Sequence, residues 1–552
     1  MERNLQEISD NSFELLIVGG GVYGAVLCWL SARAGLNVAL IEQKDFGHAT
    51  SANSQKIIHG GLRYLQNMDF FRVVQSLKER NRLMLLAPHL VQPLRSTMPI
   101  YGHGLKGKET VVAGLSLYNL IVRCFHALLK NSVHLPEAGI INIDETTKLY
   151  PGIKRRGLKG AAFWFEGICQ NTERLVLSFI KSAHRLGAVT ANYTEAKRYK
   201  QNRDGSVVVF ANDNLSGQPI EIKAERVINC TGPWFNNTIE ISTNFAEITS
   251  QEFAAGLNIV TKPIFSNQTA ISLSNADSED SRLFFIVPWR GRSIIGTEWF
   301  YYSNHIDKFQ IKEEHCLSFI KKFNASYPSA NLTLNDITFV HGGVVPCARR
   351  NGSGSEMPNI AKRFRILDLS KIDKRRIINV LGVKYTTAVD VACKVLKFVF
   401  PSMKFDDKCQ SRLIGGEFND FGAFRKQLLS NWEKRLATKE VERLLINYGS
   451  EFNSLMAYTE TAGMQSYNVR IPHVEILKAE TRFAIKQEMA KKLSDVVLRR
   501  TDMGSAGIPP ISDLKTISTL MGKELEWSAA KMGEEIEDVK RAYTLFQQTT
   551  PN

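Results

Sequence analysis

The stretch FELLIVGGGVYGAVLCWLSARAGLNVALIE, residues 13–42, decides the fold predicted for this chain. The apolar run over 13–18 predicts a strand, residues 25–34 can form a helix, and the apolar residues of 37–41 predict a second buried strand. A glycine pattern of the form G-x-G-x-x-G lies between the first strand and the helix. This order predicts a βαβ unit of the Rossmann type, which binds a dinucleotide.

Three glycines and one carboxylate of this unit are the candidate nucleotide-binding residues. Gly19 allows the tight turn, Gly21 lets the backbone approach a pyrophosphate, and Gly24 permits close packing of the helix. Glu42 follows the second strand, where it can accept a hydrogen bond from a ribose hydroxyl and repels the 2′-phosphate of NADP. The unit therefore predicts NAD or FAD, the alternative being a glycine turn that binds no ligand.

The segment after Glu42 favours FAD. Residues 44–54, KDFGHATSANS, are small and rich in hydroxyl groups. Such a loop can wrap a second phosphate and approach an isoalloxazine ring. Thr50, Ser51 and Ser54 are its candidate cofactor-binding residues.

Composition limits the class of protein. The chain has 552 residues, enough for about two to four domains, and its net charge of +15 favours anionic partners such as phosphorylated small molecules or anionic lipid. It has neither a recognition helix nor an aromatic RNA-binding motif, so no nucleic acid is expected. The eight cysteines form no CxxC pair, so neither a metal site nor a disulfide framework is predicted. A polar N-terminus and the lack of an apolar run of roughly 18 residues predict a cytoplasmic protein.

At seven places, in the same order, the chain resembles the FAD-dependent glycerol-3-phosphate dehydrogenases and oxidases, which belong to the D-amino-acid-oxidase-like flavoproteins. The similar blocks are GGGVYGA (19–25), ATSANSQKIIHGGLRYLQ (49–66), APHLVQPL (87–94), VINCTGPW (227–234), FFIVPWRGRSIIGTE (284–298), GVKYTT (382–387) and RFAIKQEMAKKLSDVVLRRT (482–501). The HGGLRYL match is more specific than the glycine pattern. The resemblance implies bound FAD.

The stretch IIHGGLRYLQ, 57–66, concentrates chemically useful residues. Gly60 and Gly61 let the backbone approach the flavin, and His59 can accept or donate a proton near neutral pH. Arg63 and Tyr64 can donate to an anionic or hydroxylated substrate. The alternative is a packed histidine beside a surface arginine. The resemblance implies that this segment runs along the flavin into the substrate pocket.

Two further turns complete the predicted site. Thr231 and Gly232 follow a predicted strand over 226–229 and are assigned to FAD binding. Lys384, Thr386 and Thr387 follow another predicted strand and lead into a helix, whose first amides can stabilise a negatively charged flavin. The resemblance implies that Lys384 contacts substrate, the alternative being a solvated lysine.

Two positions depart from the resembled family, which usually has arginine where this chain has Val345 and Val389. The arginine at the first position is associated with the substrate's phosphate or its hydroxyl-bearing carbon. Loss of a charge-assisted hydrogen bond there costs about 1.5–3 kcal/mol. Arg349 or Arg350 could replace it, the substrate could differ, or activity could be reduced.

The predicted fold is α/β, with a Rossmann-like FAD-binding domain, an α+β substrate domain built on an antiparallel sheet, and a C-terminal helical domain. Residues 283–287 and 293–297 are expected to form a hairpin, and 486–500 one amphipathic helix. The predicted boundaries are 1–100, 155–240 and 340–405 for the FAD-binding domain, 101–154 and 241–339 for the substrate or cap domain, and 408–552 for the helical domain.

The resemblance implies oxidation of sn-glycerol 3-phosphate to dihydroxyacetone phosphate by hydride transfer to flavin, with His59 as base or proton relay. Quinone is the expected electron acceptor, the alternative being oxygen. The alternatives are a different small hydroxy or amino substrate, or a flavoprotein with little turnover. Residues 114–130 could form a basic helix at the surface of an anionic membrane, or a core helix. The predicted partners are a phosphorylated polyol, quinone, this membrane surface and a second copy in a homodimer.

Overall fold

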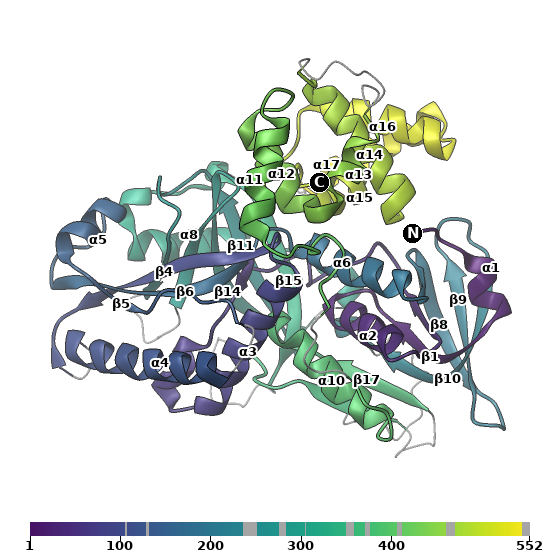
Figure 1. The fold of residues 1–552 in the computed structure, drawn as a ribbon, viewed down its shortest axis with the longest axis horizontal. Helices are drawn as coiled ribbons and strands as arrows, with labels where there is room; N and C mark the ends of the chain where they lie inside the picture. The colour runs from purple at the N-terminus through teal and green to yellow at the C-terminus, as the bar shows by residue number, and fades with distance from the viewer. Residues whose placement is uncertain are drawn as a thin grey trace, which may run out of the picture.

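Two β-sheets lie side by side, and a set of C-terminal helices packs above their junction (Figure 1). The computed structural model describes residues 1–104, 107–128, 132–235, 251–274, 283–303, 305–348, 358–369, 376–405, 411–459 and 470–543. The mixed α/β architecture agrees with the predicted fold class.

The first sheet contains the predicted βαβ unit. Its order is β16 (Arg365–Asp368), β17 (Ile377–Leu381), β10 (Pro219–Asn229), β1 (Ser12–Val18), β2 (Val38–Ile41) and β7 (Val189–Ala191), and β8 (Thr194–Gln201) and β9 (Val207–Asp213) extend from β10. The strands from β17 to β7 are parallel, which confirms the strands predicted over 13–18 and 37–41.

Three helices bury one face of this sheet: α2 (Val22–Arg33), α6 (Thr172–Arg185) and α10 (Ala388–Val399). Leu15, Ile17, Val38 and Leu40 alternate with residues that face the opposite side, and they form one core with these helices. Burial on both faces explains the nearly continuous apolar sequence of β1 and β2. The short α1 (Leu5–Asp10) buries Ile8 on the opposite face.

The second sheet is antiparallel except where β4 pairs with β12. Its order is β15 (Ile337–Cys347), β11 (Glu252–Thr261), β14 (Arg292–Tyr302), β13 (Leu283–Trp289), β12 (Ala270–Ser274), β4 (Val91–Tyr101), β6 (Leu158–Cys169) and β3 (Ile57–Ile58), with β5 (Gly139–Ile141) beside β6. The predicted hairpin is confirmed, and Trp289 pairs with Arg292 across its turn. Helices α5 (Ile143–Leu149) and α8 (Glu313–Ser326) flank this sheet, and residues of α8 pack into its core.

The strands cross the predicted domain boundaries. β4, β6 and β15 lie largely within ranges predicted for the FAD-binding domain, yet all three pair in the second sheet. The pairing of β4 with β6 joins Val91 to Cys169, residues far apart in the chain. Alternation of apolar residues identifies such strands but does not reveal their partners.

The C-terminal region is helical, as predicted. Its helices are α11 (Phe421–Trp432), α12 (Thr438–Tyr448), α13 (Phe452–Met456), α14 (His473–Glu488), α15 (Leu493–Asp495), α16 (Ile511–Leu525) and α17 (Ala529–Arg541).

The single helix predicted over 486–500 is wrong. α14 ends at Glu488, Met489 adopts a left-handed conformation with φ of 58°, and residues 496–500 form a separate π-helical turn. The chain turns here because Arg500 is buried and donates a hydrogen bond to the carbonyl of Glu488. A tertiary contact therefore overrides the helical periodicity.

Helices α3 (Phe70–Leu86) and α4 (Lys108–Leu128) pack together outside the second sheet. By length and composition, α4 is apolar enough to cross a membrane, and only 17% of its most apolar 18-residue stretch is buried. This differs from the expectation that no segment qualifies. Polar residues such as Ser116, Asn119 and Arg123 interrupt the apolar run, so a count of consecutive apolar residues misses it.

Candidate active site

A cavity of about 1510 Å³ lies between the two sheets. The residues at or just after the carboxyl ends of four parallel strands line one side, namely Val18, Glu42, Cys230 and Leu381. Strands of the second sheet line the other side. Ligands of open α/β sheets bind at this edge, and the volume exceeds the roughly 300–1,000 Å³ of ordinary ligand sites.

The glycine turn is shaped for close backbone approach. Gly19 has φ of 107°, and a Cβ there would lie 2.7 Å from the carbonyl oxygen of Cys230. Gly21 borders the cavity. Gly24 does not border it, but a Cβ at that position would lie 1.9 Å from the carbonyl oxygen of Gly19, so Gly24 allows helix packing as predicted.

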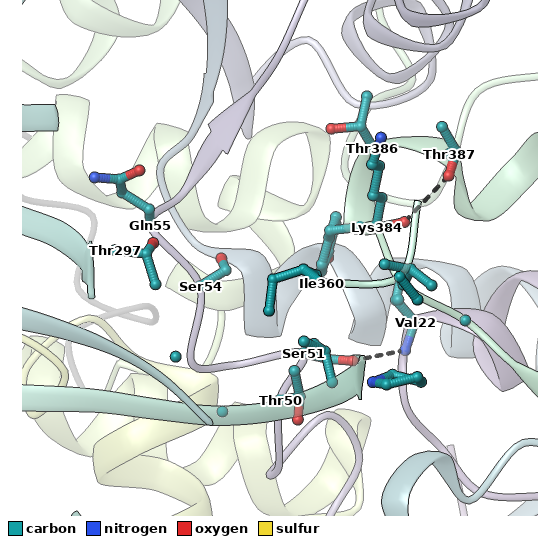
Figure 2. Close-up of a pocket in the computed structure, with 18 of the residues that line it drawn as sticks. Val22, Thr50, Ser51, Ser54, Gln55, Thr297, Ile360, Lys384, Thr386 and Thr387 are labelled. Atoms are coloured by element: carbon teal, nitrogen blue, oxygen red, sulfur yellow. Dashed lines mark hydrogen bonds between the residues drawn. The ribbon is translucent and has the colours of Figure 1, made fainter. Parts of the chain in front are cut away.

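The N-terminus of α2 faces the cavity through Gly21, Val22 and Tyr23. The amide of Val22 donates to Ser51 Oγ at 3.0 Å (Figure 2). The partial positive charge of the helix N-terminus favours an anion at this end of the cavity. This glycine cradle and helix terminus fit the pyrophosphate of a dinucleotide.

The predicted loop residues Thr50, Ser51 and Ser54 all line the cavity. Thr50 also fastens this loop to the second sheet, since its hydroxyl donates to the Val344 carbonyl at 2.9 Å and accepts from the Val344 amide at 3.1 Å. The cofactor loop is therefore built across both sheets.

Glu42 is buried at the nucleotide end of the cavity. Its carboxylate accepts hydrogen bonds from the amides of Gly20 at 2.7 Å and Lys44 at 2.9 Å. Burial outweighs these bonds and raises the pKa of Glu42 to about 7. The side chain remains on the cavity wall, where a ribose hydroxyl could reach it.

The remaining predicted cofactor residues also border the cavity, except Gly60. Gly232 adopts φ of 57°, and Thr231 Oγ1 donates to Asn229 Oδ1 at 2.7 Å. Thr386 and Thr387 lie in the short turn that precedes α10, with Thr387 Oγ1 donating to the Lys384 carbonyl at 3.4 Å (Figure 2).

Tyr23 was not predicted, although it holds the segment that carries Lys384. Its hydroxyl donates to the Lys384 carbonyl at 2.7 Å and accepts from the amides of Lys384 at 3.0 Å and Val383 at 3.1 Å. A Cβ at Gly382 would lie 2.0 Å from the Tyr23 ring, so this glycine admits the ring. Burial raises the pKa of Tyr23 to about 12 and keeps the hydroxyl protonated. The sequence contains no spacing signal for this contact.

The predicted catalytic residues meet on the cavity wall. Tyr64 lies in the turn η1 (Leu62–Asn67), and Lys384 Nζ donates a hydrogen bond to its hydroxyl. The same ammonium lies 4.7 Å from the centroid of the Tyr64 ring. His59 and the exposed Arg63 border the same cavity. The structure thus brings all four predicted catalytic residues to one site.

Glu166 of β6 is a second residue that the sequence did not reveal. Its buried carboxylate accepts from Trp164 Nε1 at 2.8 Å and from the Gly60 amide, and lies 3.7 Å from His59 Nδ1. Burial opposes ionisation, but the contacts with His59 and Arg80 lower the pKa of Glu166 overall.

Gly60 has a packing role that the sequence did not predict. It does not line the cavity, and a Cβ there would lie 2.2 Å from Arg80 Nη1. Gly60 instead lets Glu166 and Arg80 pack directly behind the histidine loop. Gly61, its neighbour, is the glycine that borders the cavity.

The two valines that replace the resembled family's arginines have different surroundings. Val345 lies on β15, where it borders the cavity with little exposure. Val389 is fully buried among the apolar side chains around α10 and does not border the cavity. Only the first therefore alters the site. Arg349 and Arg350 lie outside the described residues.

The C-terminal helices brace the cofactor loop. Asp45 is fully buried, and both oxygens of its carboxylate pair with Arg500, at 2.6 and 2.7 Å. Arg499 Nε lies 2.5 Å from the same carboxylate. These two arginines hold the pKa of Asp45 well below its usual range, although burial acts in the opposite direction. Among the described residues, no group of three or more His, Cys, Asp or Glu side chains could hold a metal ion.

The fold and cavity define a dinucleotide-dependent enzyme whose second sheet faces the cofactor. Residues 14–383 match the DAO family, described as FAD dependent oxidoreductase, and residues 409–532 match the C-terminal domain of alpha-glycerophosphate oxidase. The chain belongs to the family of FAD-dependent oxidoreductases, and its cofactor is FAD.

Similar proteins cover nearly the whole chain. The glycerol-3-phosphate dehydrogenase of Synechocystis sp. is 29% identical over 512 residues, or 90% of each chain. The aerobic glycerol-3-phosphate dehydrogenase of Bacillus subtilis is 26% identical over 98% of this chain and 96% of its own. The crystal structure of the glycerol-3-phosphate dehydrogenase from Bacillus halodurans, complexed with FAD, has a TM-score of 0.76 at 22% identity, covering 99% of this chain and 98% of its own. This last likeness supports the fold.

Proposed function

We propose that the protein oxidises the secondary alcohol of sn-glycerol 3-phosphate, or of a close relative, to the ketone. The observation that carries this proposal is that His59 and the hydrogen-bonded pair of Tyr64 and Lys384 border the cavity that also contains the nucleotide cradle. The relatives named glycerol-3-phosphate dehydrogenase support the choice of substrate.

Bound FAD supplies a two-electron acceptor for the hydrogen lost from the carbinol carbon. His59 takes the hydroxyl proton, and the Glu166 carboxylate beside it stabilises the resulting positive charge. Lys384 and Arg63 attract and orient the phosphate, while Tyr64 positions the Lys384 ammonium.

A second candidate is oxidation of a different small hydroxy or amino compound. Val345 favours it, because an apolar side chain occupies a wall position where the resembled family has arginine. Lys384 and Arg63 retain positive charge in the cavity, which supports a substrate that is still anionic.

The electron acceptor, location and assembly are also part of this proposal. We assign quinone as acceptor, and a cytoplasmic location with peripheral contact at the inner face of the membrane. Helix α4 supports that contact because Leu120, Arg123 and Leu128 are all exposed on it. A homodimer is the proposed assembly. Complete release from membranes by low salt would contradict the membrane contact, and a monomer in analytical ultracentrifugation would contradict the dimer.

Turnover with an artificial electron acceptor tests the reaction. The purified holoprotein should reduce the dye with sn-glycerol 3-phosphate and yield dihydroxyacetone phosphate, while glycerol, lactate and amino acids should be poor substrates. Dye reduction by an amino acid alone would favour the second candidate. As a control, holoprotein whose FAD has been reduced chemically should also reduce the dye, which shows that the dye can accept electrons from the bound flavin.

A further inference from the structure

One part of the cavity wall is apolar, and we call this part the apolar arm. The arm is lined by Leu62, Met98, Val111, Gly114, Leu115, Ala162 and Trp164. These residues come from η1, β4, α4 and β6. Since Tyr64 follows Leu62 in η1 and Glu166 follows Trp164 in β6, the arm begins where the catalytic residues end.

The lining of the apolar arm does not suit a small phosphorylated polyol. Gly114 has no side chain, none of the other six side chains carries a charge, and their one N–H group, Trp164 Nε1, already donates to Glu166 at 2.8 Å. A polyol phosphate would leave these apolar surfaces against water. An alkyl chain would remove them from water, which favours binding by roughly fourfold for each buried methylene.

The arm leads toward an exposed apolar surface. Thr110 of α4 and Gln66 of η1 border the cavity and are exposed to solvent. Close by in the chain, the side chains of Met68 and Phe71 are 64% and 73% exposed. Exposed apolar side chains on the segment that leads into an apolar passage suit a site that receives an amphiphile from a lipid surface.

Val345 fits the same interpretation. This valine removes a positive charge from the cavity wall, which weakens the binding of a free phosphate compound. Burial of alkyl carbons in the apolar arm can offset that loss. Lys384 and Arg63 still provide positive charge at the other end of such a molecule.

We propose that the preferred substrate is a 1-alkyl- or 1-acyl-sn-glycerol 3-phosphate, with its phosphate near Lys384 and its chain in the apolar arm. This inference rests on the proposed function and names its substrate class. The C2 hydroxyl is free in such a molecule, so the reaction is unchanged. The C2–H and O–H bonds break and the C=O bond forms. The hydrogen and both electrons of the C2–H bond pass to FAD, and the hydroxyl proton passes to His59. The proposed quinone acceptor then reoxidises the cofactor.

The test is anaerobic flavin reduction by a series of 1-O-alkyl-sn-glycerol 3-phosphates from methyl to hexyl, each below its critical micelle concentration, beside sn-glycerol 3-phosphate. The ratio of second-order rate constants, alkyl compound over parent, should rise at least tenfold along the series. A ratio near one throughout, with reduction by the parent compound, would overturn this inference and preserve the proposed function. Reduction by none of these compounds would overturn both.

The variant Gly114→Leu tests the position of the alkyl chain. A Cβ at Gly114 meets no atom within 4 Å, so a leucine can enter the arm without a clash on the helix. This variant should bring the ratio near one, and the matched variant Val112→Gln, on the exposed side of α4, should keep the wild-type ratio. If Gly114→Leu instead slows flavin reoxidation by a short-chain quinone and leaves the ratio unchanged, the arm receives the electron acceptor and the proposal is wrong.

Discussion

Lys384 and Tyr64 are 320 positions apart in the chain, yet the Lys384 ammonium donates a hydrogen bond to the Tyr64 hydroxyl on the cavity wall. The contact joins the turn that follows β17 to the turn that follows β3. Tyr23 fixes the first of these turns through three hydrogen bonds. The cation is therefore held in position before a substrate arrives, which reduces the entropy lost on binding.

Replacing Lys384 by methionine should weaken substrate binding and leave flavin content unchanged. Loss of one charge-assisted hydrogen bond to phosphate costs about 1.5–3 kcal/mol, which lowers kcat/KM more than tenfold. Steady-state kinetics and the flavin absorbance ratio provide the measurement. Lys397→Met, an exposed lysine on α10, is the matched control. An unchanged kcat/KM in the Lys384 variant would exclude the assigned role.

Glu166→Gln should slow flavin reduction more than it raises KM, because His59 loses the carboxylate that stabilises its charge after proton uptake. Glu166→Asp should recover part of the rate.

The same carboxylate should make stability depend on pH. Because the folded-state pKa of Glu166 is lowered, its ionisation stabilises the protein above about pH 4.3, and this contribution is lost as pH falls through the folded pKa. Urea unfolding should therefore show the Gln variant less stable at pH 7 and closer to wild type near pH 4.

Glu42→Gln should have opposite effects on apoprotein stability and FAD affinity. The pKa of Glu42 is raised to about 7, so its contribution favours folding at low pH and is lost as pH rises through this value. The uncharged variant should therefore melt above wild-type apoprotein at pH 8, with a smaller difference at pH 5. It should bind FAD at least tenfold more weakly, because the ribose loses a charged acceptor. Equal FAD affinity would contradict the assignment of Glu42 to the ribose.

Asp45→Asn should destabilise the protein by about 3–5 kcal/mol, because the buried Arg500 guanidinium loses its bidentate carboxylate and Arg499 keeps Asp495 alone of the two carboxylates it contacts. FAD retention should fall as well, since Asp45 lies in the cofactor loop. Glu442→Gln, which breaks an exposed pair with Arg425, should change the unfolding midpoint little. A similar small change in both variants would show that the C-terminal helices do not brace this loop.

The sequence predicted those parts of the fold that depend on local patterns. The strand, glycine turn and helix over 13–41 and the hairpin at Trp289 and Arg292 were predicted because neighbouring residues determine them. The break after Glu488 was missed because Arg500 turns the chain through contacts that are distant in sequence.

The same reason explains the missed site residues. Tyr23 and Glu166 act through partners that strand pairing and loop packing bring together. Gly60 and Gly61 were assigned to the flavin because glycine lets the backbone approach a cofactor closely. The structure adds that the missing side chain of Gly60 makes space for Arg80, a partner that is distant in sequence.

The most direct test of the proposed activity is anaerobic mixing of the oxidised holoprotein with sn-glycerol 3-phosphate while the flavin absorbance is recorded. We predict rapid bleaching at a rate that saturates with substrate concentration and falls at least a hundredfold in His59→Ala, which should retain its FAD. Bound flavin that stays oxidised with this compound and with its 1-alkyl derivatives, yet bleaches with dithionite, would contradict the proposal that the site oxidises a glycerol phosphate.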